Sequence, residues 1–138
     1  DVYKRQLIER PRITAENSVN NEVNNKIFII ENDEAMTLLL NTILDLQGYD
    51  VTVINNYEKI PECTPALIIL DAGSIDTLKG IETCRQIRKN PNFDKTKVIV
   101  TSVYHDKEMV LNAGADLYIP KPYEISNLIK WIEKLLNT

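Results

Sequence analysis

The stretch Ala66-Leu67-Ile68-Ile69-Leu70-Asp71 decides the fold, because five apolar residues run without a break into a carboxylate. Two further unbroken apolar runs, residues 27–30 and 98–100, lie before and after it along the chain. A strand with one face in solvent alternates apolar and polar residues, whereas a strand covered by helices on both faces does not. The three runs therefore predict buried strands of a parallel sheet.

Helical patterns lie between these runs and two weaker strands, predicted at residues 51–54 and 117–119. Apolar residues recur at helical spacing within residues 36–44, 81–87, 109–113 and 125–136. Strand and helix thus alternate about five times, which predicts a three-layer α/β domain with right-handed crossovers. Only eleven residues separate Ile54 from Ala66, and Pro61 and Pro65 are among them, so the second helix is predicted to be one turn at most.

Composition restricts the classes of function. The chain has 138 residues, of which 43% are apolar and 26% charged, with a net charge of -4. A mildly acidic domain is a poor ligand for nucleic acid, so no direct nucleic-acid partner is expected. Two cysteines, Cys63 and Cys84, and one histidine, His105, exclude a zinc site or a disulfide framework. No apolar run is long enough to span a membrane, so we expect no membrane contact and a cytoplasmic setting.

The chain is predicted to be organised as a tail and one domain. Residues 1–25 carry mixed charges and many asparagines, and we interpret them as a linker or disordered tail. Residues 26–138 carry all the strand and helix patterns and form the predicted domain. The basic residues of the tail are either solvated or in contact with a partner.

Polar residues follow the predicted strands at the edge where a parallel sheet places its site. Glu31-Asn32-Asp33 follow the first strand, Asp71 ends the third, Thr101-Ser102 end the fourth, and Lys121-Pro122 follow the fifth. Acidic oxygens suit a hard cation such as Mg²⁺, while a lysine and a hydroxyl suit a phosphoryl group. The sequence therefore indicates a cation-dependent site for a phosphoryl group.

Residues 26–137 resemble a response-regulator receiver domain of bacterial two-component signalling. The resemblance is carried by KIFIIEND (26–33), ALIILD (66–71), KVIVTS (97–102), AGAD (113–116) and YIPKPY (118–123), in the order of that family. It implies a doubly wound, five-stranded parallel sheet with the flavodoxin-like strand order 2-1-3-4-5 and a shortened second helix.

The same resemblance implies a role for each site residue. Asp71 would accept a phosphoryl group from a phosphohistidine, and Lys121 would contact its oxygens. Thr101 and Tyr118 would be the switch residues, Ser102 would keep the entrance small, and Pro122 would follow a cis peptide bond. Magnesium would be held by Glu31, Asn32, Asp71 and the carbonyl of Gly73.

Implied partners are a sensor histidine kinase or phosphotransfer protein upstream. Downstream, the resemblance implies a protein target or a homodimer, contacted through the last strand and its flanking helices. Catalysis would be limited to the chain's own phosphorylation and dephosphorylation. Trp131 is either a half-exposed packing residue or an interface anchor on this surface.

Three departures from the family pattern keep an alternative open. Asn32 stands where a metal-binding aspartate is usual, the Met-Pro pair after the phosphoacceptor is absent, and the loop after Asp71 is about one residue longer. A degenerate receiver, which binds proteins without being phosphorylated, is therefore the rival hypothesis. A flavin carrier of the same strand order is disfavoured because the first turn lacks a phosphate-binding loop.

Several residues also have purely structural interpretations. Asp33 is expected to cap the first helix rather than bind metal, and Glu31 could serve only the helix dipole. Cys84 is expected in the core, and Cys63 and His105 in loops.

Overall fold

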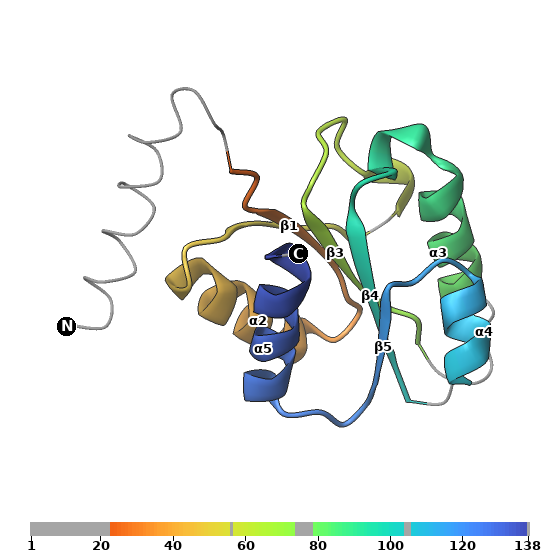
Figure 1. Cartoon of the computed structure of the whole chain (residues 1–138). Coiled ribbons are helices and arrows are strands. Elements are labelled where there is room, and N and C mark those ends of the chain that lie inside the picture. Colours follow the sequence, from red (N-terminus) through yellow and green to blue (C-terminus); the bar gives the residue numbers. More distant parts are fainter. Residues whose placement is uncertain (1–22, 56, 74–78, 104–105, 138) are drawn as a thin grey trace.

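A five-stranded parallel sheet forms the centre of the protein (Figure 1). The computed structural model describes residues 23–55, 57–73, 79–103 and 106–137. The strands lie in the order β2-β1-β3-β4-β5, as predicted. Their bounds are β1 (Lys26–Ile30), β2 (Asp50–Val53), β3 (Leu67–Asp71), β4 (Lys97–Ser102) and β5 (Leu117–Pro120).

Helices cover both faces of this sheet, which explains why its central strands are apolar without alternation. On one face, α2 (Glu34–Leu46) and α5 (Ile125–Leu136) pack on Ile27, Ile29 and Ile69. On the other face, α3 (Lys79–Lys89) and α4 (Lys107–Asn112) pack on Phe28 and Ile68 and their neighbours. Successive residues of each strand thus enter different cores, and the predicted three-layer architecture is confirmed.

The expected second helix is reduced to the short 3₁₀ turn η1 (Tyr57–Lys59), as the two prolines indicated. A second 3₁₀ turn, η2 (Pro91–Phe93), connects α3 to β4. Cys84 is fully buried in α3, and burial raises the pKa of its thiol to about 11, so it acts as a core residue. Cys63 is half-buried in the connection before β3.

Most of the predicted tail lies outside the described residues, as does His105. Two residues at the end of that tail are bonded to the domain. The Asn24 side chain donates a hydrogen bond to the carbonyl of Thr64, and that of Asn25 donates to the carbonyl of Gly48. No described helix is long and apolar enough to cross a membrane.

Arg88 joins two connections at the end of the sheet opposite the polar residues, the one from η2 to β4 and the one from α4 to β5. Its guanidinium donates to the carbonyls of Gly114, Phe93 and Thr96 at 2.7–3.1 Å. It also pairs with the carboxylate of Asp116 at 2.8 Å. One planar, fixed-charge group therefore satisfies acceptors from η2, the start of β4 and the turn before β5.

We expect Arg88→Ala to lower the free energy of unfolding by about 2–4 kcal/mol, because it leaves several acceptors unpaired. Arg85→Ala is the matched control on the same helix. Its exposed pair with Glu82, 3.4 Å long, should contribute about 0.5 kcal/mol or less. Urea unfolding of both variants measures the difference, and equal losses would contradict this role for Arg88.

Candidate functional site

The carboxyl ends of β1, β3, β4 and β5 bring the predicted polar residues together. Asp71 is the last residue of β3 and pairs in register with Thr101 of β4. Glu31 follows β1 directly, and Lys121 follows β5. Parallel strands in register end at one edge, so residues distant in sequence meet there.

Lys121 connects the two acidic side chains of this edge. Its Nζ lies 2.9 Å from Oε1 of Glu31 and 3.3 Å from Oδ2 of Asp71. The exposed fractions of the three side chains are 18%, 3% and 10%, so the group is largely removed from water. The backbone N–H of Lys121 donates to the carbonyl of Ser102, and the peptide bond to Pro122 is cis.

Glu31 is turned inward. Its Oε2 accepts hydrogen bonds from the backbone N–H groups of Asn32 and Asp33, at 3.0 and 3.3 Å. Burial raises the pKa of its carboxyl to about 7, and a hydrogen bond with Asp71 adds to the rise, while Lys121 opposes it. Glu31 therefore positions the Lys121 ammonium by accepting a hydrogen bond from it.

Asp71 is the more acidic of the two carboxyls. Burial alone would raise its pKa, but hydrogen bonds from Glu31 and from the Gly73 N–H, together with Lys121, hold that pKa below its ordinary value. The Gly73 bond is 3.0 Å long and is made with a φ of 82°, a conformation that favours glycine. Asp71 is thus an ionised, partly desolvated carboxylate.

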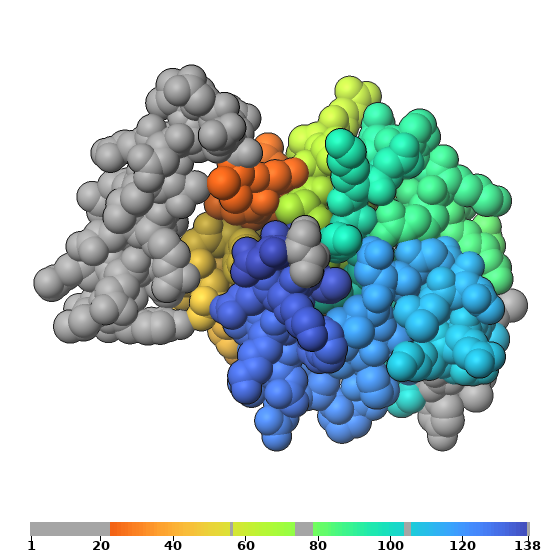
Figure 2. Space-filling model, in the orientation of Figure 1, coloured from red at the N-terminus to blue at the C-terminus, as the bar shows by residue number. Residues whose placement is uncertain are grey.

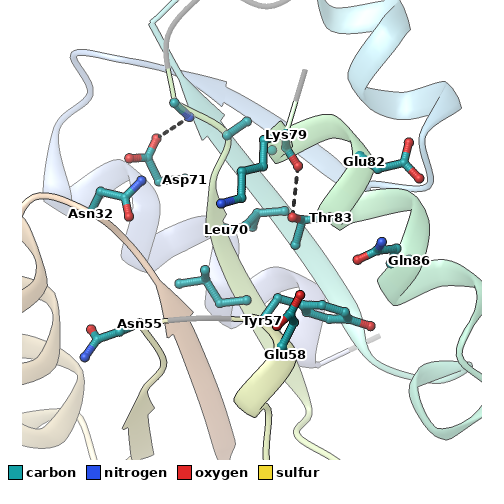
Figure 3. A pocket seen from close by; sticks show the side chains of 14 residues that line it. Asn32, Asn55, Tyr57, Glu58, Leu70, Asp71, Lys79, Glu82, Thr83 and Gln86 are labelled. Atoms are coloured by element: carbon teal, nitrogen blue, oxygen red, sulfur yellow. Dashed lines mark hydrogen bonds between the residues drawn. The ribbon is translucent and has the colours of Figure 1, made fainter. Parts of the chain in front are cut away.

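A pocket of about 610 Å³ opens beside Asp71 and extends between η1 and α3 (Figure 3). The end near the carboxylate is formed by Asn32, Asp71 and Gly73. The rest includes residues of η1 and α3, such as Tyr57, Lys79 and Thr83, and apolar residues from the ends of β1 and β3. Because η1 is only three residues long, this side of the pocket is bounded by one short turn.

The remaining predicted residues occupy the same edge. Thr101 and Ser102 are buried, and Oγ of Ser102 lies 3.1 Å from the hydroxyl of Tyr118. Tyr118 is half-buried in β5. Asp33 caps α2 by accepting from the backbone N–H groups of Ala35 and Met36, which confirms the capping interpretation.

The oxygen atoms at this end of the pocket are of the type that binds Mg²⁺, but together they carry little negative charge. Asp71 offers a carboxylate, and Asn32 and Gly73 offer amide and carbonyl oxygens, all hard ligands. Within the described residues, no group of three or more His, Cys, Asp or Glu is placed to hold a metal ion. Asn32 is neutral, and both oxygens of Glu31 are already hydrogen bonded, so the pocket wall supplies little charge to a cation.

Sequence reasoning missed Lys79, which lines the pocket at the start of α3. It follows a loop with no strong pattern, and nothing marked it as part of the site. The signal that could have found it is the Lys79-Gly80 pair at the end of that loop.

Comparison with known proteins agrees with the fold and with the order of the motifs. The family profile described as response regulator receiver domain matches residues 27–133. The transcriptional regulatory protein CpxR homolog of Haemophilus influenzae is 34% identical over 115 residues, covering 80% of this chain and 50% of that protein. The chain spans about half the length of the curated relatives it matches.

Solved structures show the same fold. The response regulator DrrB of Thermotoga maritima, an OmpR/PhoB homolog, has a TM-score of 0.68 at 27% identity, over 81% of this chain and 52% of that one. The receiver domain of sensor histidine kinase PA1611 from Pseudomonas aeruginosa has a TM-score of 0.65 at 21% identity, over 83% of this chain and 99% of that one. That structure has a magnesium ion coordinated in its active site cleft.

Proposed function

The chain belongs to the response regulator receiver domain family, and on that premise we propose that it accepts a phosphoryl group on Asp71. The donor would be the phosphohistidine of a sensor histidine kinase or of a phosphotransfer protein. The observation that carries the proposal is the Asp71 carboxylate, 3.3 Å from the Lys121 ammonium and open to a pocket.

The residues of the site fit the transfer step. An oxygen of Asp71 forms the new P–O bond while the P–N bond of the donor breaks. The leaving nitrogen keeps the bonding electron pair and takes up a proton from water. Lys121 neutralises the incoming phosphoryl oxygens, and the Thr101 hydroxyl donates to one of them. Mg²⁺ would be held by Asn32, Asp71 and the Gly73 carbonyl, and it would screen the charge between the donor and the carboxylate.

The direct test uses phosphoramidate, a small donor with the same type of P–N bond. The protein is incubated with it at saturating Mg²⁺ and its intact mass is measured. We expect the addition of one phosphoryl group, removed by hydroxylamine as acyl phosphates are. A protein that takes up no phosphate under these conditions would contradict the proposal.

The degenerate receiver remains the second candidate because of one observation. Asn32 lines the pocket together with Asp71 and is neutral where receiver domains usually have an aspartate, so the site has one carboxylate fewer to hold Mg²⁺. In that case the fold and the binding surface would act without phosphorylation.

The proposed output surface combines α4, β5 and α5, which lie side by side in Figure 2. Tyr118 of β5 connects this surface to the site, since its hydroxyl lies 3.1 Å from Oγ of Ser102. Rearrangement of Thr101 and Tyr118 on phosphorylation would shift the population of two surface conformations. The partner would be a downstream protein or a second copy of the chain.

Trp131 tests this surface. It is 40% exposed on α5, and the ammonium of Lys134 lies 5.1 Å from its ring centre. We expect Trp131→Ala to weaken self-association or partner binding at least fivefold, with a fall in melting temperature of only about 2–4 °C. Analytical ultracentrifugation of the phosphorylated protein and thermal unfolding measure the two effects. A large stability loss with unchanged association would assign Trp131 to packing alone.

A further inference from the structure

Lys79 brings a positive charge into the pocket that contains Asp71. It is the first residue of α3 and lines the pocket together with Asn32 and Asp71. Figure 3 shows its side chain extending into the pocket, with the amino group on the side of Asp71. The carboxylates of Glu58 and Glu82 lie toward the η1 and α3 walls in the same view.

Close backbone packing fixes the start of α3 at this place. A Cβ atom on Gly80 would overlap the backbone of Ala72, the residue after Asp71. Only glycine permits that approach, so the helix begins directly against the end of β3. The backbone of Lys79 is therefore held close to the end of β3, although its side chain is exposed.

Among the described residues, the ammonium of Lys79 has no ion-pair partner. Lys121, by contrast, is paired with both Glu31 and Asp71. Glu82, one turn further along α3, is paired with Arg85. Lys79 thus brings to this pocket a positive charge that no described residue neutralises.

We propose that Lys79 is a second cationic residue of the phosphorylation site, contacting the phosphoryl oxygens from the α3 side and lowering the requirement for Mg²⁺. The inference rests on the proposed phosphorylation of Asp71. Compared with a receiver that has an aspartate at position 32, the pocket wall has one negative charge fewer, and Lys79 adds one positive charge. Together they make the pocket a poorer site for a divalent cation and a better one for a phosphoryl group.

This role predicts two effects of opposite sign for Lys79→Met, a substitution that keeps the length of the side chain and removes its charge. Mg²⁺ should bind the unphosphorylated protein roughly three- to tenfold more tightly, because a repelling charge is gone. Phosphorylation by phosphoramidate in EDTA should slow at least tenfold, because the oxygens lose a partner. At saturating Mg²⁺ the phosphorylation rates of the wild type and of Lys79→Met should approach each other.

The control is Lys89→Met, which removes the same charge from the other end of α3. Lys89 is exposed and does not line the pocket, so we expect less than a twofold change in either quantity. Isothermal titration with MgCl₂ measures binding, and intact-mass time courses measure the rates. Lys79→Arg, which restores the charge, should recover the rate in EDTA.

The outcomes separate this inference from the function on which it rests. The inference alone would be overturned if the wild type is phosphorylated but Lys79→Met has an unchanged Mg²⁺ affinity or an unchanged metal-free rate. If Lys79→Met loses phosphorylation both in EDTA and at saturating Mg²⁺ and also melts at a lower temperature, Lys79 has a structural role and the inference is overturned. A wild type that takes up no phosphate at any Mg²⁺ concentration would overturn both.

Discussion

Asp71→Asn is expected to reduce phosphate uptake by roughly a thousandfold or more, to below detection. The amide has the shape of the carboxylate but neither its charge nor its nucleophilic oxygen. Asp71 is the acceptor that the geometry favours, because it is ionised, borders the pocket and lies 3.3 Å from Lys121. The measurement is the intact mass after phosphoramidate treatment at saturating Mg²⁺.

The matched control is Asp33→Asn, which makes the same chemical change two residues after Glu31. Asp33 caps α2 through its side-chain oxygen, and asparagine caps nearly as well, so uptake of phosphate should be unchanged. Asp71→Asn should remain folded, because Lys121 keeps its 2.9 Å pair with Glu31. A phosphoryl group still found on Asp71→Asn would place the acceptor elsewhere.

The fold was predictable because both faces of the sheet are buried. Runs such as residues 67–70 must be apolar at every position when helices pack on each side, and that pattern is readable without a structure. The short second helix was readable too, since Pro61 and Pro65 leave room only for η1.

The site was predictable in part. Residues at strand ends, such as Asp71 and Lys121, could be placed because parallel topology collects them at one edge. The inward turn of Glu31 depends on local backbone donors and on Lys121, which composition does not reveal. Lys79 was missed because its place depends on the contact of Gly80 with Ala72, a packing detail across the loop.

Asn32→Asp is expected to tighten Mg²⁺ binding roughly tenfold and to speed phosphorylation by a similar factor. Asn32 and Asp71 line the same end of the pocket, so the new carboxylate would add a full negative charge to the ligand set. Without metal, the added charge repels Asp71 and should lower the melting temperature. With Mg²⁺, the variant should gain more stability than the wild type does, because the ligand binds only the folded state.

Asn55→Asp separates coordination from a general effect of charge. Asn55 lines the same pocket, and Figure 3 shows it away from Asp71, in the lower part of the view with Tyr57 and Glu58. The same charge at that position should change Mg²⁺ affinity by less than threefold, because the distance weakens its attraction and water screens it. If Asn32→Asp gives no more than Asn55→Asp does, the ion does not bind beside residue 32. If the wild type takes up no phosphate and Asn32→Asp does not restore uptake, the chain acts as a degenerate receiver.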